Sequence, residues 1–150
     1  MSVRNGKLMV LIDTNIFLRI LVKENKRVFE ESRKALELIE QAVVSAYTNT
    51  IVLTEIQFVL TSVYRYQRQA ITEALEAVVA FPSVKLVDDT DAHLAVRLYG
   101  KTQVKFADCL LASSRRVQEG KAAILSYDRD FDRLGVRRLE PRDLLKKRKR

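Results

Sequence analysis

Short apolar runs alternate along the chain with longer stretches in which apolar residues recur every three or four positions. A short, continuous apolar run is typical of a strand buried on both faces, and the wider spacing is typical of an amphipathic helix. The pattern predicts strands at 8–12, 45–48, 84–87, 122–125 and 136–139, and helices after Asp13 and over 28–44, 50–64, 69–81, 90–99 and 106–119.

Proline and glycine set two of these boundaries. Pro82 ends the helix over 69–81, because a residue before proline disfavours helical geometry. Gly120 is a typical stop for the helix over 106–119. Strands that alternate with helices predict a parallel sheet between helical layers, so we expect a three-layer α/β/α sandwich.

The domain organisation predicted from the sequence is simple. No low-complexity linker or internal repeat divides the chain, so we expect one domain over 1–145, followed by a basic tail over 146–150. In a parallel sheet, ligands bind beyond the carboxyl ends of the strands. Side chains that follow the strands are therefore the first candidates for a site.

The net charge of +8 is concentrated at the two ends of the chain. Residues 146–150 carry five positive charges, Arg4 and Lys7 carry two, and a net charge of only one remains for residues 8–145. A basic tail can bind a phosphate backbone without sequence preference, or it can simply be solvated. Charge alone therefore does not identify the function.

The composition excludes several classes of protein. With 47% hydrophobic and 31% charged residues, it is typical of a globular domain. No apolar run approaches the roughly 20 residues of a membrane helix, and no cleavage site typical of a signal peptide follows the first apolar run. The single cysteine, Cys109, excludes an intramolecular disulfide framework and suits a reducing cytoplasm, where we expect the protein to act.

Four carboxylates are candidates for one shared site. Asp13 directly follows the strand at 8–12, and Asp128 lies shortly after the strand at 122–125, so both are expected at the same edge of the sheet. Glu55 and Asp108 lie on predicted helices in apolar surroundings. Burying such groups in the ionised form is costly unless a cation or a metal ion compensates.

Hard oxygen ligands without a histidine or cysteine cluster favour Mg²⁺ or Mn²⁺ over zinc. These ions lower the pKa of a bound water and neutralise charge that develops on a phosphate. A site made of carboxylates alone is therefore suited to hydrolysing phosphodiesters.

Each acid also has a purely structural interpretation. Asp13 and Asp128 could cap the helices that follow them, and Asp108 could interact with its helix dipole. Glu55 could form an ion pair with a lysine or arginine. One shared site explains all four acids at once.

Four short motifs surround the acids: Leu11-Ile-Asp-Thr-Asn15, Thr54-Glu-Ile56, Phe106-Ala-Asp-Cys-Leu-Leu-Ala112 and Ser126-Tyr-Asp-Arg-Asp-Phe131. They resemble, in the same order, the motifs of the PIN-domain ribonucleases, and most closely those of the VapC-type toxins of toxin–antitoxin pairs. The resemblance runs from about Leu8 to Pro141, and it implies a parallel α/β/α fold, endonucleolytic cleavage of RNA, an antitoxin partner and a homodimer.

The resemblance assigns a role to each acid. It implies that Asp13, Glu55 and Asp108 ligate Mg²⁺ or Mn²⁺. Asp128 would complete the set, directly or through water, and Asp130 lies close enough in sequence to share or replace that role.

Polar and basic residues complete the predicted site. Asn15 and Ser126 match polar positions of the family and would orient ligands or waters. A metal-activated water would attack the phosphate in line and leave a 5′-phosphate and a 3′-hydroxyl. Candidate contacts to the RNA backbone near the Asp108 helix, besides the tail, are Lys101, Lys105, Arg115 and Arg116.

Two alternatives remain for a chain with this pattern. A phosphotransfer enzyme of the haloacid-dehalogenase type also begins with a strand followed by Asp, but it needs a second Asp two positions later, where this chain has Asn15. A noncatalytic RNA-binding or assembly module with the same fold is the other alternative. Nucleotide-binding loops and a serine-nucleophile motif are absent from the sequence.

Overall fold

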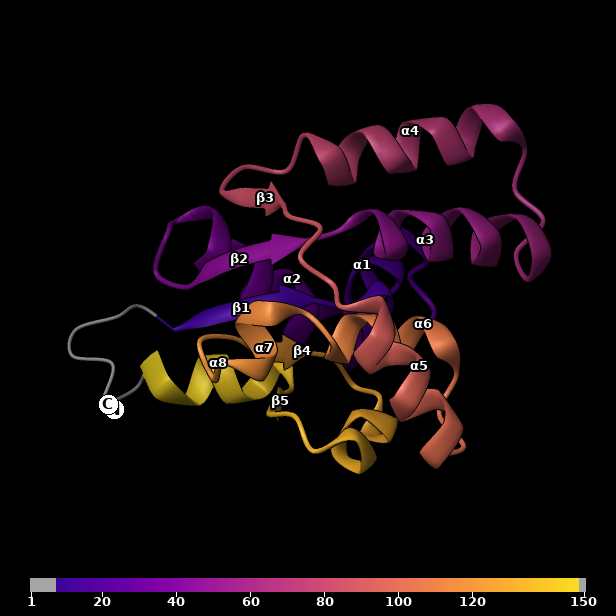
Figure 1. The fold of residues 1–150 in the computed structure, drawn as a ribbon. Coiled ribbons are helices and arrows are strands. Elements are labelled where there is room, and N and C mark those ends of the chain that lie inside the picture. The colour runs from indigo at the N-terminus through magenta and orange to yellow at the C-terminus, as the bar shows by residue number, and fades with distance from the viewer. Residues whose placement is uncertain (1–7, 149–150) are drawn as a thin grey trace.

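A five-stranded parallel sheet forms the centre of the computed structural model, which describes residues 8–148 (Figure 1). Helix α2 lies behind the sheet and α7 in front of it, so the predicted parallel α/β/α architecture is confirmed. In the spatial order β3-β2-β1-β4-β5, the strands are β3 (Val84–Leu86), β2 (Ser45–Thr48), β1 (Met9–Ile12), β4 (Ala123–Leu125) and β5 (Arg138–Leu139).

Strand β1 is the central strand because its residues are apolar on both faces. Val10, Leu11 and Ile12 are fully buried, and β1 pairs with β2 on one side and β4 on the other. A continuous apolar run is what a strand covered by helices on both faces requires. The core of the domain therefore surrounds the strand that leads directly to Asp13.

Eight α-helices and one 3-10 helix surround the sheet in the described part of the chain. Helix α8 packs on α2, and α3 packs on both α1 and α4. The helices are α1 (Thr14–Leu21), α2 (Lys26–Glu40), α3 (Thr50–Ser62), α4 (Arg68–Val79), α5 (Ala92–Lys101), α6 (Phe106–Ala112), α7 (Arg115–Gln118), the 3-10 helix η1 (Arg129–Leu134) and α8 (Pro141–Arg148).

Helix α2 ends at Glu40, so the prediction that it continues to residue 44 was wrong. Ala42 adopts the left-handed conformation, with φ of 59°, and the Val43 amide donates to the carbonyl oxygen of Leu38. This is the Schellman arrangement, in which a left-handed residue closes the last turn. Alanine holds that position here, and glycine, the usual marker of such an end, is absent.

The single helix predicted over 106–119 is also wrong, because two serines interrupt it. The Ser114 hydroxyl donates to the Asp89 carboxylate at 2.6 Å, and the Arg115 amide donates to the Asp89 carbonyl at 2.9 Å. The Ser113 hydroxyl bonds to the Leu110 carbonyl at 2.7 Å. Such local bonds compete with the helical pattern, so the chain forms α6 and α7 in place of one helix.

Two elements of the last third were not predicted. The segment after Asp128 forms η1, and Pro141 begins α8, which continues to Arg148 across the predicted tail boundary at 146. Proline at the first helical position is favourable because its missing amide is not needed there. The last two residues of the predicted tail, Lys149 and Arg150, lie outside the described residues.

Among residues 8–148, no helix has the length and apolar character needed to cross a membrane.

Replacing Leu11 by alanine tests the central role of β1. Leu11→Ala removes a fully buried side chain, so we expect the free energy of unfolding to fall by about 2–5 kcal/mol in urea titrations. Leu86→Ala on strand β3, where the side chain is 43% exposed, should cost less than about 1 kcal/mol. Equal losses in the two variants would contradict this placement of the core.

Candidate active site

The carboxyl ends of β1 and β4 bring Asp13 and Ser126 together. Ile12 pairs with Leu125 in the sheet register, and the Asp13 amide donates to the Leu125 carbonyl at 3.1 Å. The next side chains therefore emerge side by side. The Ser126 hydroxyl donates to Oδ2 of Asp13 at 2.7 Å.

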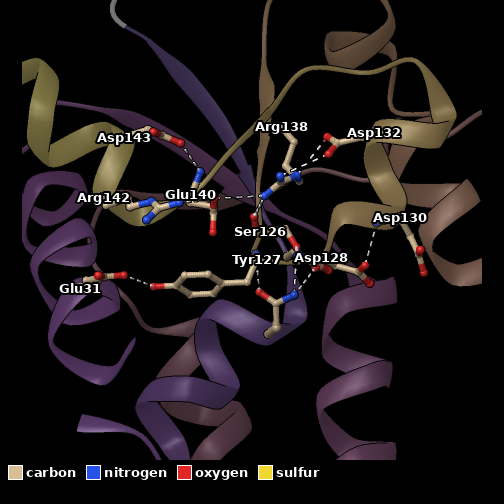
Figure 2. A network of polar contacts seen from close by, with 12 residues as sticks. Glu31, Ser126, Tyr127, Asp128, Asp130, Asp132, Arg138, Glu140, Arg142 and Asp143 are labelled. Atoms are coloured by element: carbon tan, nitrogen blue, oxygen red, sulfur yellow. Dashed lines mark hydrogen bonds and ion pairs between the residues drawn. The ribbon is translucent and has the colours of Figure 1, made fainter. Parts of the chain in front are cut away.

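Asn15 ties this pair to the following loop. Its amide nitrogen donates to Oδ2 of Asp13 and to Oγ of Ser126, both at 2.9 Å. Its carbonyl oxygen accepts the Tyr127 amide at 3.3 Å, and the Tyr127 hydroxyl donates to Glu31 of helix α2 (Figure 2). Asn15 and Ser126 therefore hold the Asp13 carboxylate in one orientation.

Asp128, the N-cap of η1, and Asp130, in the first turn of η1, reach the same region. The Asp128 amide donates to the Ser126 hydroxyl, and Oδ1 of Asp128 accepts the Asp130 amide, each at 2.9 Å. One carboxylate oxygen from each of Asp108, Asp128 and Asp130 lies within 4.8 Å of the other two. Both candidates for the fourth acid are thus near Asp108.

A lysine connects the remaining two acids. Nζ of Lys105 lies 3.0 Å from Oε2 of Glu55 and 3.8 Å from Oδ1 of Asp108. Helix α3 supplies Glu55, and Lys105 directly precedes α6, which supplies Asp108. The ion pair therefore joins two helices that are far apart in sequence.

Burial and mutual repulsion alter the acidity of the cluster. Burial raises the pKa of Asp13 to about 6, against the lowering effect of the hydrogen bonds from Ser126 and Thr14. Burial also raises the pKa of Asp108 to about 8, and the negative charge of Asp13 adds to the rise while Lys105 opposes it. Ionising all of the acids at once is therefore unfavourable unless a further cation is present.

The residues fit a divalent metal ion. Asp108 is 1% exposed, and its Oδ2 has no hydrogen-bond partner among the described residues; the same holds for the buried Oε1 of Glu55. Buried carboxylate oxygens are normally paired, and clustered oxygens are the ligands that Mg²⁺ and Mn²⁺ prefer. Asp108, Asp128 and Asp130 are the residues placed to hold such an ion, with Glu55 and Asp13 beside them.

The structural roles considered from the sequence are present as well. Asp13 caps α1 by accepting the Thr14 amide at 2.8 Å, and Asp128 caps η1. Asp108 lies in the first turn of α6, and Glu55 forms the ion pair considered for it. These structural roles are compatible with one shared site, because each acid fills its local role at the position where the cluster forms.

Of the four predicted cationic contacts, only Lys105 bonds to the acids of the cluster within the described residues. The Arg116 guanidinium lies 2.8 Å from the Asp89 carboxylate and 5.5 Å from the centre of the Tyr47 ring. Arg115 lines a hollow formed by the loop over 88–91. The sequence placed Arg115 and Arg116 on the Asp108 helix, but the break after α6 gives them other neighbours.

Comparisons with known proteins agree with the fold. The sequence model of the PIN domain family matches residues 10–137. A protein described as a VapC ribonuclease, from Aquifex aeolicus strain VF5, is 27% identical over 133 residues, covering 89% of this chain and 97% of that protein.

Two solved structures have similar folds. One chain in the crystal structure of VapBC2 from Rickettsia felis, bound to a DNA fragment from its promoter, matches with a TM-score of 0.62 at 18% identity, over 89% of this chain and 98% of the other. VapC20 of Mycobacterium tuberculosis, described as a toxin that cleaves the sarcin–ricin loop, matches with a TM-score of 0.58 at 17% identity, over 85% and 95%.

The raised pKa values predict how stability depends on pH. In the folded protein Asp13 and Asp108 bind protons up to about pH 6 and 8, whereas an unfolded aspartate releases its proton near 3.8. Their contribution to stability is therefore full below about pH 4. It is lost as the pH rises through about 6 for Asp13 and about 8 for Asp108. We expect the Tm of the metal-free protein to fall between about pH 4 and 8, and Mn²⁺ to reduce the fall.

Asp108→Asn isolates this effect, because the amide has no proton to lose. We expect the variant to be more stable than the wild type at pH 8.5, by about 2–4 °C in Tm for each kcal/mol of repulsion removed. Glu76→Gln, at an exposed position on α4, should keep the wild-type dependence. Parallel Tm curves for Asp108→Asn and the wild type would show that Asp108 does not carry this titration.

Proposed function

This chain belongs to the PIN domain family, and on that basis we propose that it is a metal-dependent endoribonuclease and the toxin of a toxin–antitoxin pair. The VapC ribonuclease relative, covered over almost its whole length, supports cleavage of RNA. The observation that carries the proposal is the convergence of Asp108, Asp128 and Asp130, together with buried oxygens of Glu55 and Asp108 that have no hydrogen-bond partner in the described part of the chain.

Asp13, Glu55, Asp108 and Asp128 are the proposed metal-site acids, and the closeness of Asp130 to Asp108 and Asp128 supports the proposal that it shares the role of Asp128. A bound Mg²⁺ or Mn²⁺ would lower the pKa of a coordinated water and neutralise charge on the scissile phosphate. Hydrolysis would then add water to the phosphorus, release the 3′-hydroxyl and leave the 5′-phosphate on the other fragment.

The chain's own residues prepare the site for this reaction. Ser126 and Asn15 donate to one oxygen of Asp13, which fixes the direction of the carboxylate. The Lys105 side chain is 58% exposed while it bonds to Glu55, so its ammonium group can also meet a phosphate from the solvent side. We therefore propose Lys105 as the contact to the RNA backbone.

An antitoxin partner is supported by the VapBC2 structure, in which one chain has a fold similar to that of this protein. We propose that a small antitoxin, encoded by a neighbouring reading frame, binds this protein in the cytoplasm. We also propose that the protein is a homodimer. Light scattering on the purified protein, alone and co-expressed with the neighbouring reading frame, tests the antitoxin complex and the dimer. A monomer in each sample would contradict them.

Incubation with structured RNA tests the proposed activity. We expect cleavage with Mn²⁺ or Mg²⁺, no cleavage in EDTA, and products with 5′-phosphate and 3′-hydroxyl ends. Asp13→Asn and Asp108→Asn should lower the rate by at least about 100-fold, because even residues behind metal ligands are commonly worth about 10- to 100-fold. Glu76→Gln, far from the acids in sequence and exposed, should cleave like the wild type.

Two outcomes would overturn the proposal. Cleavage that persists in EDTA, or at an equal rate in Asp13→Asn, would remove the metal mechanism. RNA that binds without being cleaved, with an affinity unchanged in Asp108→Asn, would identify a noncatalytic RNA-binding module.

Lys105 can be tested separately from the acids. At saturating Mn²⁺ we expect Lys105→Ala to raise KM for RNA by about tenfold, the equivalent of one charged hydrogen bond of about 1.4 kcal/mol. Arg116→Ala, which removes a cation bound to Asp89, should leave KM unchanged. A raised KM in Arg116→Ala with an unchanged KM in Lys105→Ala would instead assign the contact to the RNA backbone to α7.

A further inference from the structure

Two of the acids in the cluster lie on one short loop. The chain leaves β4 at Leu125, and the segment from Ser126 to Asp132 contains both Asp128 and Asp130. From Arg129 onward the segment belongs to the 3-10 helix η1, whose Phe131 is fully buried and anchors it from within. The contacts at the two ends of the segment complete the support of both carboxylates.

One arginine side chain bonds to both ends (Figure 2). Arg138 donates from Nη1 to the Ser126 carbonyl at 3.1 Å, at the start of the loop. It also donates from Nε and Nη2 to the two carboxylate oxygens of Asp132, at 3.1 and 3.3 Å, at the end of the loop. The guanidinium group thus bridges seven residues of chain that carry two acids of the cluster.

Arg138 is itself well fixed. It lies on β5, where the Ile124 amide bonds to the Arg137 carbonyl and the Ser126 amide to the Leu139 carbonyl, both at 2.9 Å. Its side chain is only 12% exposed, and Nη1 lies 3.7 Å from Glu140. Because the guanidinium group is planar and pre-organised, Arg138 loses little conformational freedom for each hydrogen bond that it forms.

We propose that Arg138 is a positioning residue for the metal site, which holds Asp128 and Asp130 at the spacing that a divalent cation requires. The inference rests on the proposed metal-dependent function. Arg138 does not contact the acids of the cluster; it acts through Ser126 and Asp132. Groups that orient metal ligands in this way commonly contribute about 10- to 100-fold to metal affinity.

The chemistry of arginine explains why this position needs it. Three of its N–H groups, in one plane, reach a backbone carbonyl and both oxygens of a carboxylate at once, which a lysine ammonium cannot do with the same geometry. Its positive charge also persists at any pH near neutrality.

Mn²⁺ binding to the metal-free protein, measured by calorimetry or by the paramagnetic signal of free Mn²⁺, tests the proposal without any RNA. We expect Arg138→Ala to raise the Mn²⁺ dissociation constant by about tenfold or more. Asp132→Asn, which weakens the same bridge from a side chain that is 54% exposed, should raise it in the same direction without unfolding the protein. In the double variant, the Mn²⁺ dissociation constant should rise by less than the product of the two single-variant fold-changes, because both substitutions break the same bridge.

Arg142 supplies the matched control. It is a half-exposed arginine of the same ion network, 3.4 Å from Glu140, and it bonds to neither end of the loop. Arg142→Ala should therefore bind Mn²⁺ like the wild type.

The outcomes separate the inference from the proposed function. A folded Arg138→Ala or Asp132→Asn protein with wild-type affinity for Mn²⁺ would overturn the inference, even if its Tm were lower, because Arg138 would then support only the fold. Wild-type protein that does not bind Mn²⁺, or binds it equally well as Asp108→Asn, would overturn the proposed metal site itself.

Discussion

Ionised carboxylates are costly to bury beside one another, and the cost is met by hydrogen-bond donors, by a lysine or by a metal ion. The site in this protein uses hydrogen-bond donors and a lysine. Asp13 receives hydrogen bonds from Ser126 and Asn15, whereas Asp108 is near Lys105 and has one buried oxygen without a partner among residues 8–148. Burial and the neighbouring charge of Asp13 raise the pKa of Asp108, and a bound metal ion would oppose this rise.

The framework around the acids exists to hold them close in spite of this repulsion. The register of β1 against β4 brings Asp13 next to Ser126, and the turn into η1 brings Asp128 and Asp130 toward α6. Neighbouring helices cover the sheet on both faces, and the last residues of β1 and β4, Ile12 and Leu125, are fully buried. Arg138 bonds to both ends of the segment that carries Asp128 and Asp130, at Ser126 and at Asp132.

Helix ends and breaks were the least predictable part of the fold. The apolar spacing that identified α2 continued through Val43, and only the left-handed Ala42 shows where the helix stops. Likewise, nothing in the local pattern distinguishes Ser113 and Ser114 from helical residues. Their bonds to Leu110 and Asp89 become visible only when the loop that contains Asp89 packs against them. That break also separates Arg116 from the acids it was expected to accompany.

The sequence by itself determined the parallel α/β architecture, because continuous apolar runs and helical spacing follow from which faces must be buried. It also determined that Asp13 and a residue near Asp128 lie at one edge of the sheet, since parallel strands end there together. The tertiary structure alone decided that Asp130 joins Asp128 beside Asp108, that Lys105 bridges two helices, and that Arg138 holds the loop. These contacts join segments far apart in the chain, and their distances depend on packing that no local pattern records.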